Sequence, residues 1–314
     1  LDEYWEDETV NPLYDAPEFT STWKFYTKDP VFSRPPVGTQ VAIKKMYLRD
    51  STIGFSMESV RELKLLQEIH HPNIISVYHV YIRHDNLCMV MECLPNDLEK
   101  FINNANIILT QSHIKCIMMM ILKGVAKLHE MYIMHRDLKP SNILIAEDGT
   151  LRIADFGGAK FAGSPNRKFS PQACTLWYRA PELLFGSKYY GPQSDMWSVG
   201  CIFGEILLRT PLFMGESTDI TQLEKIFSIL GPATEQDWPG VSSLPGYIAF
   251  SAPVPFRPLE ADLHASPKSA VNLLLRILQK NPRKRISAAE ALLDPYFTES
   301  PLPCLPSDLP GING

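Results

Sequence analysis

Four short motifs stand in a fixed order along this 314-residue chain, and they limit its fold more than any other feature. V-A-I-K at residues 41–44 comes first, and H-R-D-L-K-P-S-N follows at residues 135–142. D-F-G at 155–157 begins eighteen residues after Asp137, and A-P-E at 180–182 completes the set. A lone D-F-G could occur in any buried turn, but chance does not explain four motifs in this order and spacing.

In order and spacing the motifs resemble the signature set of protein kinases. The resemblance implies the bilobal kinase fold, of class α+β, in which a small lobe of antiparallel sheet with one helix joins a large, mainly helical lobe. It also implies transfer of the γ-phosphate of ATP with Mg²⁺ as cofactor, a reaction whose catalysis is mostly positioning and charge neutralisation.

The same resemblance implies roles for single residues. Asp137 would orient the substrate hydroxyl and accept its proton, while Lys139 would place a positive charge on the transferring phosphate. Asn142 and Asp155 would bind Mg²⁺ and, through it, the nucleotide phosphates. A lysine at position 139 resembles serine/threonine kinases, because tyrosine kinases usually carry alanine there.

Lys44 lies in a predicted strand, Val41 to Met46, and Glu62 lies eighteen residues later in a predicted helix, Ser56 to Ile69. By resemblance Glu62 would pair with Lys44 and hold it against the phosphates, so that movement of the helix would break the pair. The helix prediction depends on an apolar stripe with helical spacing at Val60, Leu63, Leu66 and Ile69.

The adenine would bind where the two lobes join. The resemblance places Met91 at the back of this pocket and Glu92 to Leu94 on the connecting strand, whose backbone would hydrogen-bond the base. Asp97 has two open interpretations, since it could reach the ribose or cap the helix that follows.

Three segments narrow the resemblance to the cyclin-dependent kinases. S-M-E-S-V-R-E at 56–62 resembles their cyclin-binding helix, T-L-W-Y-R-A-P-E-L-L-F-G at 175–186 resembles their activation segment, and Gln222 to Pro239 resembles their insert. The family implies a cyclin partner, a nuclear or cytoplasmic location, and control of the cell cycle or of transcription. It also implies substrates with Ser-Pro or Thr-Pro sites, with Trp177 to Arg179 shaping the pocket for the proline.

Two branches of the family compete. G-S-P-N-R-K-F-S-P-Q at 163–172 resembles the kinase that activates other cyclin-dependent kinases, whose substrates are kinase activation loops. The tail from Tyr296 to Pro310 resembles instead the cell-cycle-related kinase. We favour the activating branch slightly.

Ser170 stands where the family has its activating phosphate, and Pro171 follows it. Arg61, Arg136 and Lys160 match the three basic positions that would receive a phosphate at this site. The alternative is that Ser170 is an ordinary solvated loop serine.

Several features have structural interpretations instead. His135 is expected in the core, Asp195 is expected to anchor the catalytic loop, and Glu182 and Arg285 are expected to form a structural ion pair. The run Met118 to Met120 is expected to pack in the core.

One departure from the kinase pattern raises a second hypothesis. Residues 1–37 contain no glycine, although a glycine-rich phosphate loop should fall near residues 15–30. The chain could bind ATP weakly, it could be a pseudokinase scaffold for a cyclin or kinase, or its first forty residues could be unrelated to the kinase. Because all five catalytic positions remain, we favour the enzyme; they are Lys44, Glu62, Asp137, Asn142 and Asp155.

Composition agrees with a globular enzyme. The net charge of -5 argues against a nucleic-acid or membrane partner, and the six cysteines include no C-x-x-C pair for zinc. We expect an atypical segment at 1–40, a kinase domain at 41–298 and a proline-rich tail at 299–314. The lobes of the kinase domain would divide into 41–94 and 95–298.

Overall fold

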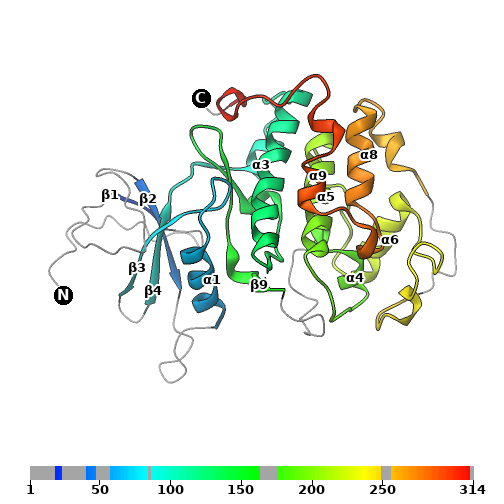
Figure 1. Cartoon of the computed structure of the whole chain (residues 1–314), viewed down its shortest axis with the longest axis horizontal. Helices are drawn as coiled ribbons and strands as arrows, with labels where there is room; N and C mark the ends of the chain where they lie inside the picture. The colour runs from blue at the N-terminus through cyan, green and yellow to red at the C-terminus, as the bar shows by residue number, and fades with distance from the viewer. Residues whose placement is uncertain are drawn as a thin grey trace.

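The computed structural model describes residues 18–22, 40–46, 57–83, 86–162, 176–248 and 256–311. It has two lobes, with the strands β1 to β4 and helix α1 on one side and the long helices on the other (Figure 1). This is the α+β kinase architecture expected from the sequence.

The small lobe is built on one antiparallel sheet with the strand order β1-β2-β4-β3. Its strands are β1 (Glu18–Thr22), β2 (Gln40–Met46), β3 (Val77–Arg83) and β4 (Asn86–Glu92). In β2, Lys44 pairs with Met89 of β4 at the centre of the sheet. β1 is an edge strand that pairs with β2, and its residues include no proline. Pro30, Pro35 and Pro36, which argue against a central strand, lie between β1 and β2 in the sequence.

Helix α1 (Met57–Glu68) lies against this sheet with a face that overlaps the predicted one but is turned toward Glu62. Leu66 and Ile69 are buried as expected, but Val60 is 43% exposed and Glu62 is 3% exposed. The inward stripe therefore begins at Glu62 and continues through Leu65, a spacing that suits a helix equally well. A carboxylate buried on a helix face needs a partner of opposite charge.

The large lobe is mainly helical, and its long helices α3 and α5 lie side by side at its centre (Figure 1). Its α-helices are α2 (Leu98–Asn103), α3 (Gln111–Glu130), α4 (Pro181–Leu184), α5 (Gln193–Leu208), α6 (Asp219–Leu230), α7 (Leu259–Asp262), α8 (Lys268–Ile277) and α9 (Ala288–Ala291). The core side of α3 includes Met118 and Met120, which are buried, while Met119 packs against the core from a partly buried position. The methionine run is thus core, as predicted.

Short strands hold the site segments at the face of the large lobe that meets the small lobe. β5 (Asn96–Asp97), β7 (Ile143–Ile145) and β8 (Leu151–Ile153) form one sheet, and β6 (Ile133–Met134) pairs with β9 (Lys160–Phe161). The segment 135–142 follows β6 and the segment 155–157 follows β8, so the two motifs that carry aspartates come from neighbouring loops.

The proline-rich tail packs on α3 more closely than an extended surface segment would. Lys115 of α3 donates hydrogen bonds to the carbonyl oxygens of Glu299 (2.6 Å) and Pro301 (2.8 Å). Pro306–Asp308 forms a 3₁₀ turn, and the Leu309 that follows is buried. The tail is therefore part of the folded large lobe.

A search of the described helices found none with the length and apolar character needed to cross a membrane.

Candidate active site

The segment 135–142 is held in place by a buried carboxylate from the core helix α5. Asp195 is 1% exposed, and its two oxygens accept the backbone N–H of His135 (2.9 Å) and of Arg136 (2.8 Å). Arg136 has the left-handed φ of 73°, which costs a non-glycine residue about 1–2 kcal/mol. The bonds to Asp195 offset this strain, so the loop has one defined path, and the anchoring role predicted for Asp195 fits this geometry.

His129 also faces Asp195, with Nε2 3.0 Å from Oδ2. Burial alone would raise the pKa of the Asp195 carboxyl, but the hydrogen bond from His129 and the nearby His135 hold the pKa below its ordinary value. Asp195 is therefore a permanent anion beneath the loop.

Replacing Asp195 by asparagine is expected to lower both stability and kcat. The amide offers one acceptor oxygen where the carboxylate offers two, and each buried donor left unpaired costs about 1–3 kcal/mol. Urea unfolding and kcat at saturating ATP measure the two effects. The surface change Asp262→Asn serves as control, and a kcat for Asp195→Asn equal to that of the control would refute the anchoring.

His135 is buried, as predicted, and links the loop to the strand that precedes Asp155. Its Nδ1 accepts the backbone N–H of Asp137 (3.3 Å), so Nε2 carries the proton that is donated to the carbonyl oxygen of Ala154 (2.9 Å). Its ring also lies edge-on to Phe156, with centroids 4.9 Å apart. His135 thus fixes the distance between the two aspartate motifs.

Asp137, Lys139 and Asn142 form one hydrogen-bonded group. The Lys139 ammonium lies 3.0 Å from Oδ2 of Asp137. Asn142 donates from Nδ2 to the carbonyl oxygen of Asp137 (2.7 Å) and to its Oδ2 (3.1 Å). Because the amide nitrogen faces Asp137, the amide oxygen of Asn142 is its remaining group for a cation.

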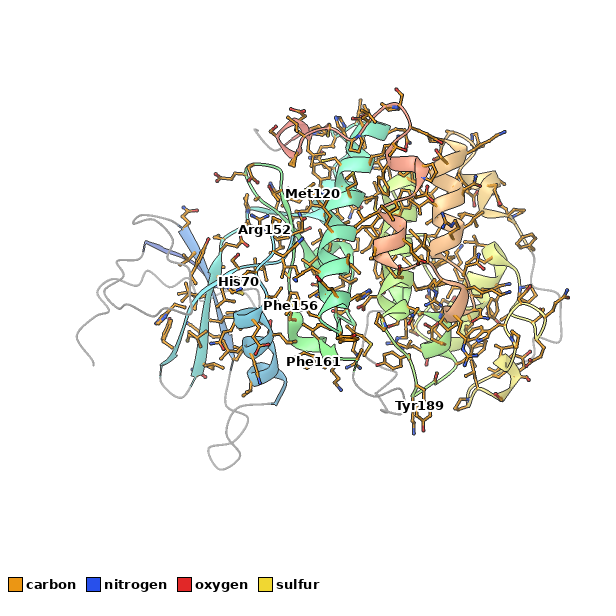
Figure 2. The ribbon with its side chains drawn as sticks, in the orientation of Figure 1. His70, Met120, Arg152, Phe156, Phe161 and Tyr189 are labelled. Carbon is orange, nitrogen blue, oxygen red and sulfur yellow. The ribbon has the colours of Figure 1, made fainter. Side chains whose placement is uncertain are left out.

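Lys44, Glu62 and Asp155 form a second group, which spans the two lobes. The Lys44 ammonium lies 2.8 Å from Oε1 of Glu62 and 3.0 Å from Oδ1 of Asp155. Lys44 is the partner that the buried Glu62 requires. Phe156, the residue after Asp155, lies fully buried between α1 and the large lobe (Figure 2).

The charges of this group reinforce one another. Burial alone would lower the pKa of the Lys44 ammonium, but the carboxylates of Glu62 and Asp155 raise its pKa above the ordinary value. Burial would likewise raise the pKa of Asp155, but the Lys44 charge and hydrogen bond hold it below its ordinary value. Both groups are therefore ionised at neutral pH, and a cation and an anion are presented to the same space.

The residues predicted to bind adenine lie at the junction of the lobes. Met91 is half-buried in β4 and pairs with Ala42 of β2. Leu94 packs against the core just beyond the strand. Asp97 caps α2, since its side chain accepts the backbone N–H of Lys100 at 2.8 Å, which matches one of its two interpretations.

The side chain of Glu92 has a partner that the sequence did not reveal. It accepts the backbone N–H of Ser76 (2.8 Å) and pairs with Arg152 of β8, whose Nε lies 3.2 Å from Oε1. A charged pair sixty residues apart leaves no periodic signal in the sequence.

The predicted phosphate-receiving site is only partly described. Ser170 and the side chain of Arg61 lie outside the described residues. Arg136 donates from Nη1 to the carbonyl oxygen of Gly158 (3.3 Å), and Lys160 lies in β9 opposite Met134. The assembly of these residues around a phosphate stays a prediction.

The segment Trp177 to Arg179, predicted to shape the pocket for proline, is fixed by bonds that sequence reasoning missed. Trp177 donates from Nε1 to the carbonyl oxygen of Gly215 (3.0 Å), and Arg179 pairs with Asp219 (2.9 Å). Between them, the Tyr178 hydroxyl donates to Glu205 of α5 (2.7 Å).

Glu182 and Arg285 form the structural ion pair expected from the sequence. Arg285 donates from Nη1 and Nη2 to the two oxygens of Glu182, each at 2.8 Å, and both side chains are almost fully buried. The guanidinium also lies over the ring of Trp197, 5.2 Å from its centroid. The pair joins the end of the activation segment to the core of the large lobe.

The arrangement places the carboxylate of Asp137, which can accept a proton, beside Lys139. Where the lobes meet it places Lys44, which can bind the phosphates of a nucleotide, beside Asp155, which can bind the metal ion of those phosphates. The fold and these two groups together define a protein kinase.

Comparison with known proteins gives the same result. The family model described as "Protein kinase domain" matches residues 34–297. "Cyclin-dependent kinase 7" of Dictyostelium discoideum is 45% identical over 269 residues, which are 85% of this chain and 74% of that protein. "Cyclin-dependent kinase 7" of Xenopus laevis is 45% identical over 276 residues, which are 87% of this chain and 78% of that protein.

A solved structure is also similar, the CAK complex of Chaetomium thermophilum bound to ATP-gamma-S. The match has a TM-score of 0.82 and 40% identity, and it covers 88% of each chain.

The chain therefore belongs to the protein kinase family, among the cyclin-dependent kinases. It is an enzyme, a serine/threonine protein kinase that uses ATP. The comparisons support this reading and give no support to the pseudokinase alternative.

Proposed function

We propose that this kinase belongs to the activating branch of its family and phosphorylates serine or threonine followed by proline. Its substrates would include the activation loops of other kinases, and it would act in the nucleus or cytoplasm with a cyclin subunit. The similarity to two proteins named cyclin-dependent kinase 7 and to a CAK complex supports the branch. The observation that carries the activity is the pair of hydrogen-bonded groups around Asp137 and Asp155.

The donors present fit a magnesium ion. Asp155 is half exposed and offers carboxylate oxygens, and Asn142 offers its amide oxygen, which are the hard ligands that Mg²⁺ prefers. The described residues contain no cluster of three or more histidine, cysteine, aspartate or glutamate side chains that could hold a metal. Two protein ligands suffice where nucleotide phosphates complete the shell. Bound there, Mg²⁺ would neutralise phosphate charge.

The chain's own residues would divide the remaining work. Lys44, held by Glu62, would contact the nucleotide phosphates. The Asp137 carboxylate would accept the proton of the substrate hydroxyl, and Lys139 would stabilise the charge on the transferring phosphate. The backbone of Glu92 to Leu94, with Met91 behind it and Asp97 near the ribose, would hold the adenosine.

A cyclin would act on the Lys44–Glu62 pair through α1. Glu62 is the residue of α1 that reaches Lys44, so a partner that fixes the position of α1 also fixes this ion pair. The exposed Val60, two residues before Glu62, gives such a partner an apolar contact.

Replacing Ser170 by alanine is expected to lower the cyclin-dependent activity about tenfold or more. A phosphate on Ser170 adds nearly two negative charges, which would order the activation segment through Arg61, Arg136 and Lys160. Phosphate transfer by the cyclin complex is measured for the wild type and for Ser170→Ala. Ser141→Ala is not suitable as a control, because Ser141 lies in the catalytic segment. Ser266→Ala, in the large lobe, is the control. Equal rates for the wild type and Ser170→Ala would contradict the regulation.

Substrate choice tests the proposed function itself. The cyclin complex is given a Ser-Pro peptide, the same peptide with Ser-Ala, and an inactive partner kinase with an intact activation loop. We expect phosphate in the Ser-Pro peptide and in the activation loop, and at most about a tenth as much in Ser-Ala. Equal use of Ser-Pro and Ser-Ala would contradict the proline-directed assignment.

A further inference from the structure

We propose that Arg152 is a positioning residue for the nucleotide, acting through Glu92. Arg152 clasps the segment that links the lobes to the strand that leads into Asp155. The inference rests on the proposed placement of adenine against Glu92 to Leu94. Arg152 itself would not contact the nucleotide.

The clasp begins on β8, three residues before Asp155. Arg152 lies where the strands of the small lobe meet the β7–β8 hairpin of the large lobe (Figure 2). Its Nε lies 3.2 Å from Oε1 and 3.3 Å from Oε2 of Glu92, and its Nη1 donates to the carbonyl oxygen of Pro72. One guanidinium thus bonds the end of β4 and the loop between α1 and β3.

Glu92 passes this restraint to the linker through Ser76. Its Oε1 accepts the backbone N–H of Ser76 at 2.8 Å, and its own backbone N–H donates to the carbonyl oxygen of Ser76 at 3.2 Å. The side chain and the backbone of Glu92 are therefore tied to the same residue. The Glu92 carboxylate and the backbone that leads to Leu94 are thus held at the same point of the 71–76 loop.

The loop at residues 71–76 is itself hydrogen-bonded to β8. Ile153 donates its N–H to the carbonyl oxygen of Asn73 (2.9 Å), and Ile75 donates to the carbonyl oxygen of Ile153 (2.9 Å). Asn73 also donates from Nδ2 to the carbonyl oxygen of Leu151 (3.0 Å). This part of the small lobe is therefore fixed to the large lobe, and Arg152 extends the fixed region to the linker.

α3, β8 and the loop at residues 71–76 are closely packed where they meet. A Cβ added at Gly124 of α3 would lie 2.7 Å from Cδ1 of Ile153 and 2.8 Å from the carbonyl oxygen of Asn73. α3 thus packs directly against β8 and the loop at residues 71–76. Loss of the Arg152 side chain would remove its direct bonds to Glu92 and Pro72, while the backbone bonds of β8 and the bonds between Glu92 and Ser76 remain.

The ion pair between Arg152 and Glu92 is largely buried. The side chains of Arg152 and Glu92 are 18% and 13% exposed, so solvent screens their attraction only in part. The planar guanidinium reaches both Glu92 and Pro72 at once, which a lysine ammonium does not reproduce. Without Arg152 the Glu92 carboxylate keeps only the Ser76 N–H among the bonds described above.

The test compares Arg152→Met, Arg152→Lys and the control Arg276→Met in the cyclin complex. Arg276 forms an ion pair with Asp294 inside the large lobe, so its loss removes an arginine pair away from the linker. ATP affinity is measured by direct titration, and KM for ATP and kcat by phosphate transfer. For Arg152→Met we expect Kd and KM for ATP to rise about tenfold, which corresponds to about 1.4 kcal/mol, while kcat at saturating ATP stays within about twofold.

Arg152→Lys is expected to lie between the wild type and Arg152→Met, because one charged contact to Glu92 is retained. Adding Glu92→Gln to Arg152→Met should weaken ATP binding little further, since the two residues act as one unit. An ATP affinity for Arg152→Met and Arg152→Lys equal to that of Arg276→Met would overturn the clasp. Failure of the wild type to bind ATP would instead overturn the proposed function, and the clasp with it.

Discussion

Replacing Asp155 by asparagine is expected to lower kcat by about 10³-fold and to leave the fold intact. Asparagine has the same shape and can still accept the hydrogen bond that Lys44 donates to Oδ1. It removes the negative charge that would hold Mg²⁺, while Glu62 still holds the Lys44 ammonium. Phosphate transfer with saturating ATP measures the change, and urea unfolding without nucleotide measures the stability.

Asp148→Asn is the matched control, because Asp148 is exposed in the turn of the same hairpin, seven residues earlier. We expect its activity to equal that of the wild type. The nucleotide should also raise the melting temperature of Asp148→Asn, and should do so much less for Asp155→Asn. Comparable kcat values for the two variants would show that Asp155 does not serve the transfer.

Replacing Glu182 by leucine is expected to destabilise the large lobe by about 3–5 kcal/mol, because it leaves the Arg285 guanidinium charged and buried. Arg285 is fully buried and keeps its bonds to the carbonyl oxygens of Gln193 and Gln279, which cannot neutralise its charge. The free energy of unfolding in urea, with and without the substitution, measures the loss.

Two further variants separate a lost ion pair from a lost contact. Glu130→Ala removes an exposed partner of Lys127 and should cost at most about 0.5 kcal/mol. The double change Glu182→Leu with Arg285→Met should be less destabilised than Glu182→Leu alone, since no unpaired charge remains. If the double variant were the less stable of the two, packing and not charge would explain the pair.

The proposed catalytic residues were predicted from the resemblance of four motifs to the kinase signature set, and their roles stay predictions. The structure brings Lys44, Glu62 and Asp155 together, and it adds a hydrogen bond between Asn142 and Asp137 that was not predicted. Apolar residues that repeat with helical spacing also predict a helix from Ala270 to Lys280 in the large lobe, but they do not fix its ends. The observed helix, α8, spans Lys268–Ile277, and the Lys280 side chain beyond it donates to the carbonyl oxygens of Gly231 and Pro232.

Periodicity gives the spacing of a helix face but not its direction. In α1 the predicted stripe is buried at Leu66 but exposed at Val60, and Glu62 is buried although it lies outside that stripe. The charged partner Lys44, on a different element, accounts for the inward position of Glu62. The clasp between Glu92 and Arg152 was missed for a related reason, because only the folded junction brings the two residues together.

The tail shows the limit of composition. Its proline content distinguishes the segment in the sequence but does not predict that Lys115 donates hydrogen bonds to the carbonyl oxygens of Glu299 and Pro301. The start of the chain shows the same limit. The missing glycines argued against an ordinary phosphate loop, yet Glu18–Thr22 still adds an edge strand beside β2.

Phosphate transfer by the unaltered chain with a cyclin decides whether this site is a working active site. The assay follows labelled phosphate from ATP into a Ser-Pro peptide, first with Mg²⁺ and then after EDTA is added. Because Lys44, Asp137 and Asp155 are already held by their partners, we expect Mg²⁺-dependent transfer even though residues 1–37 contain no glycine. A folded, cyclin-bound chain that transfers no phosphate, and whose melting temperature does not change with ATP and Mg²⁺, would contradict the assignment of this site as a working active site.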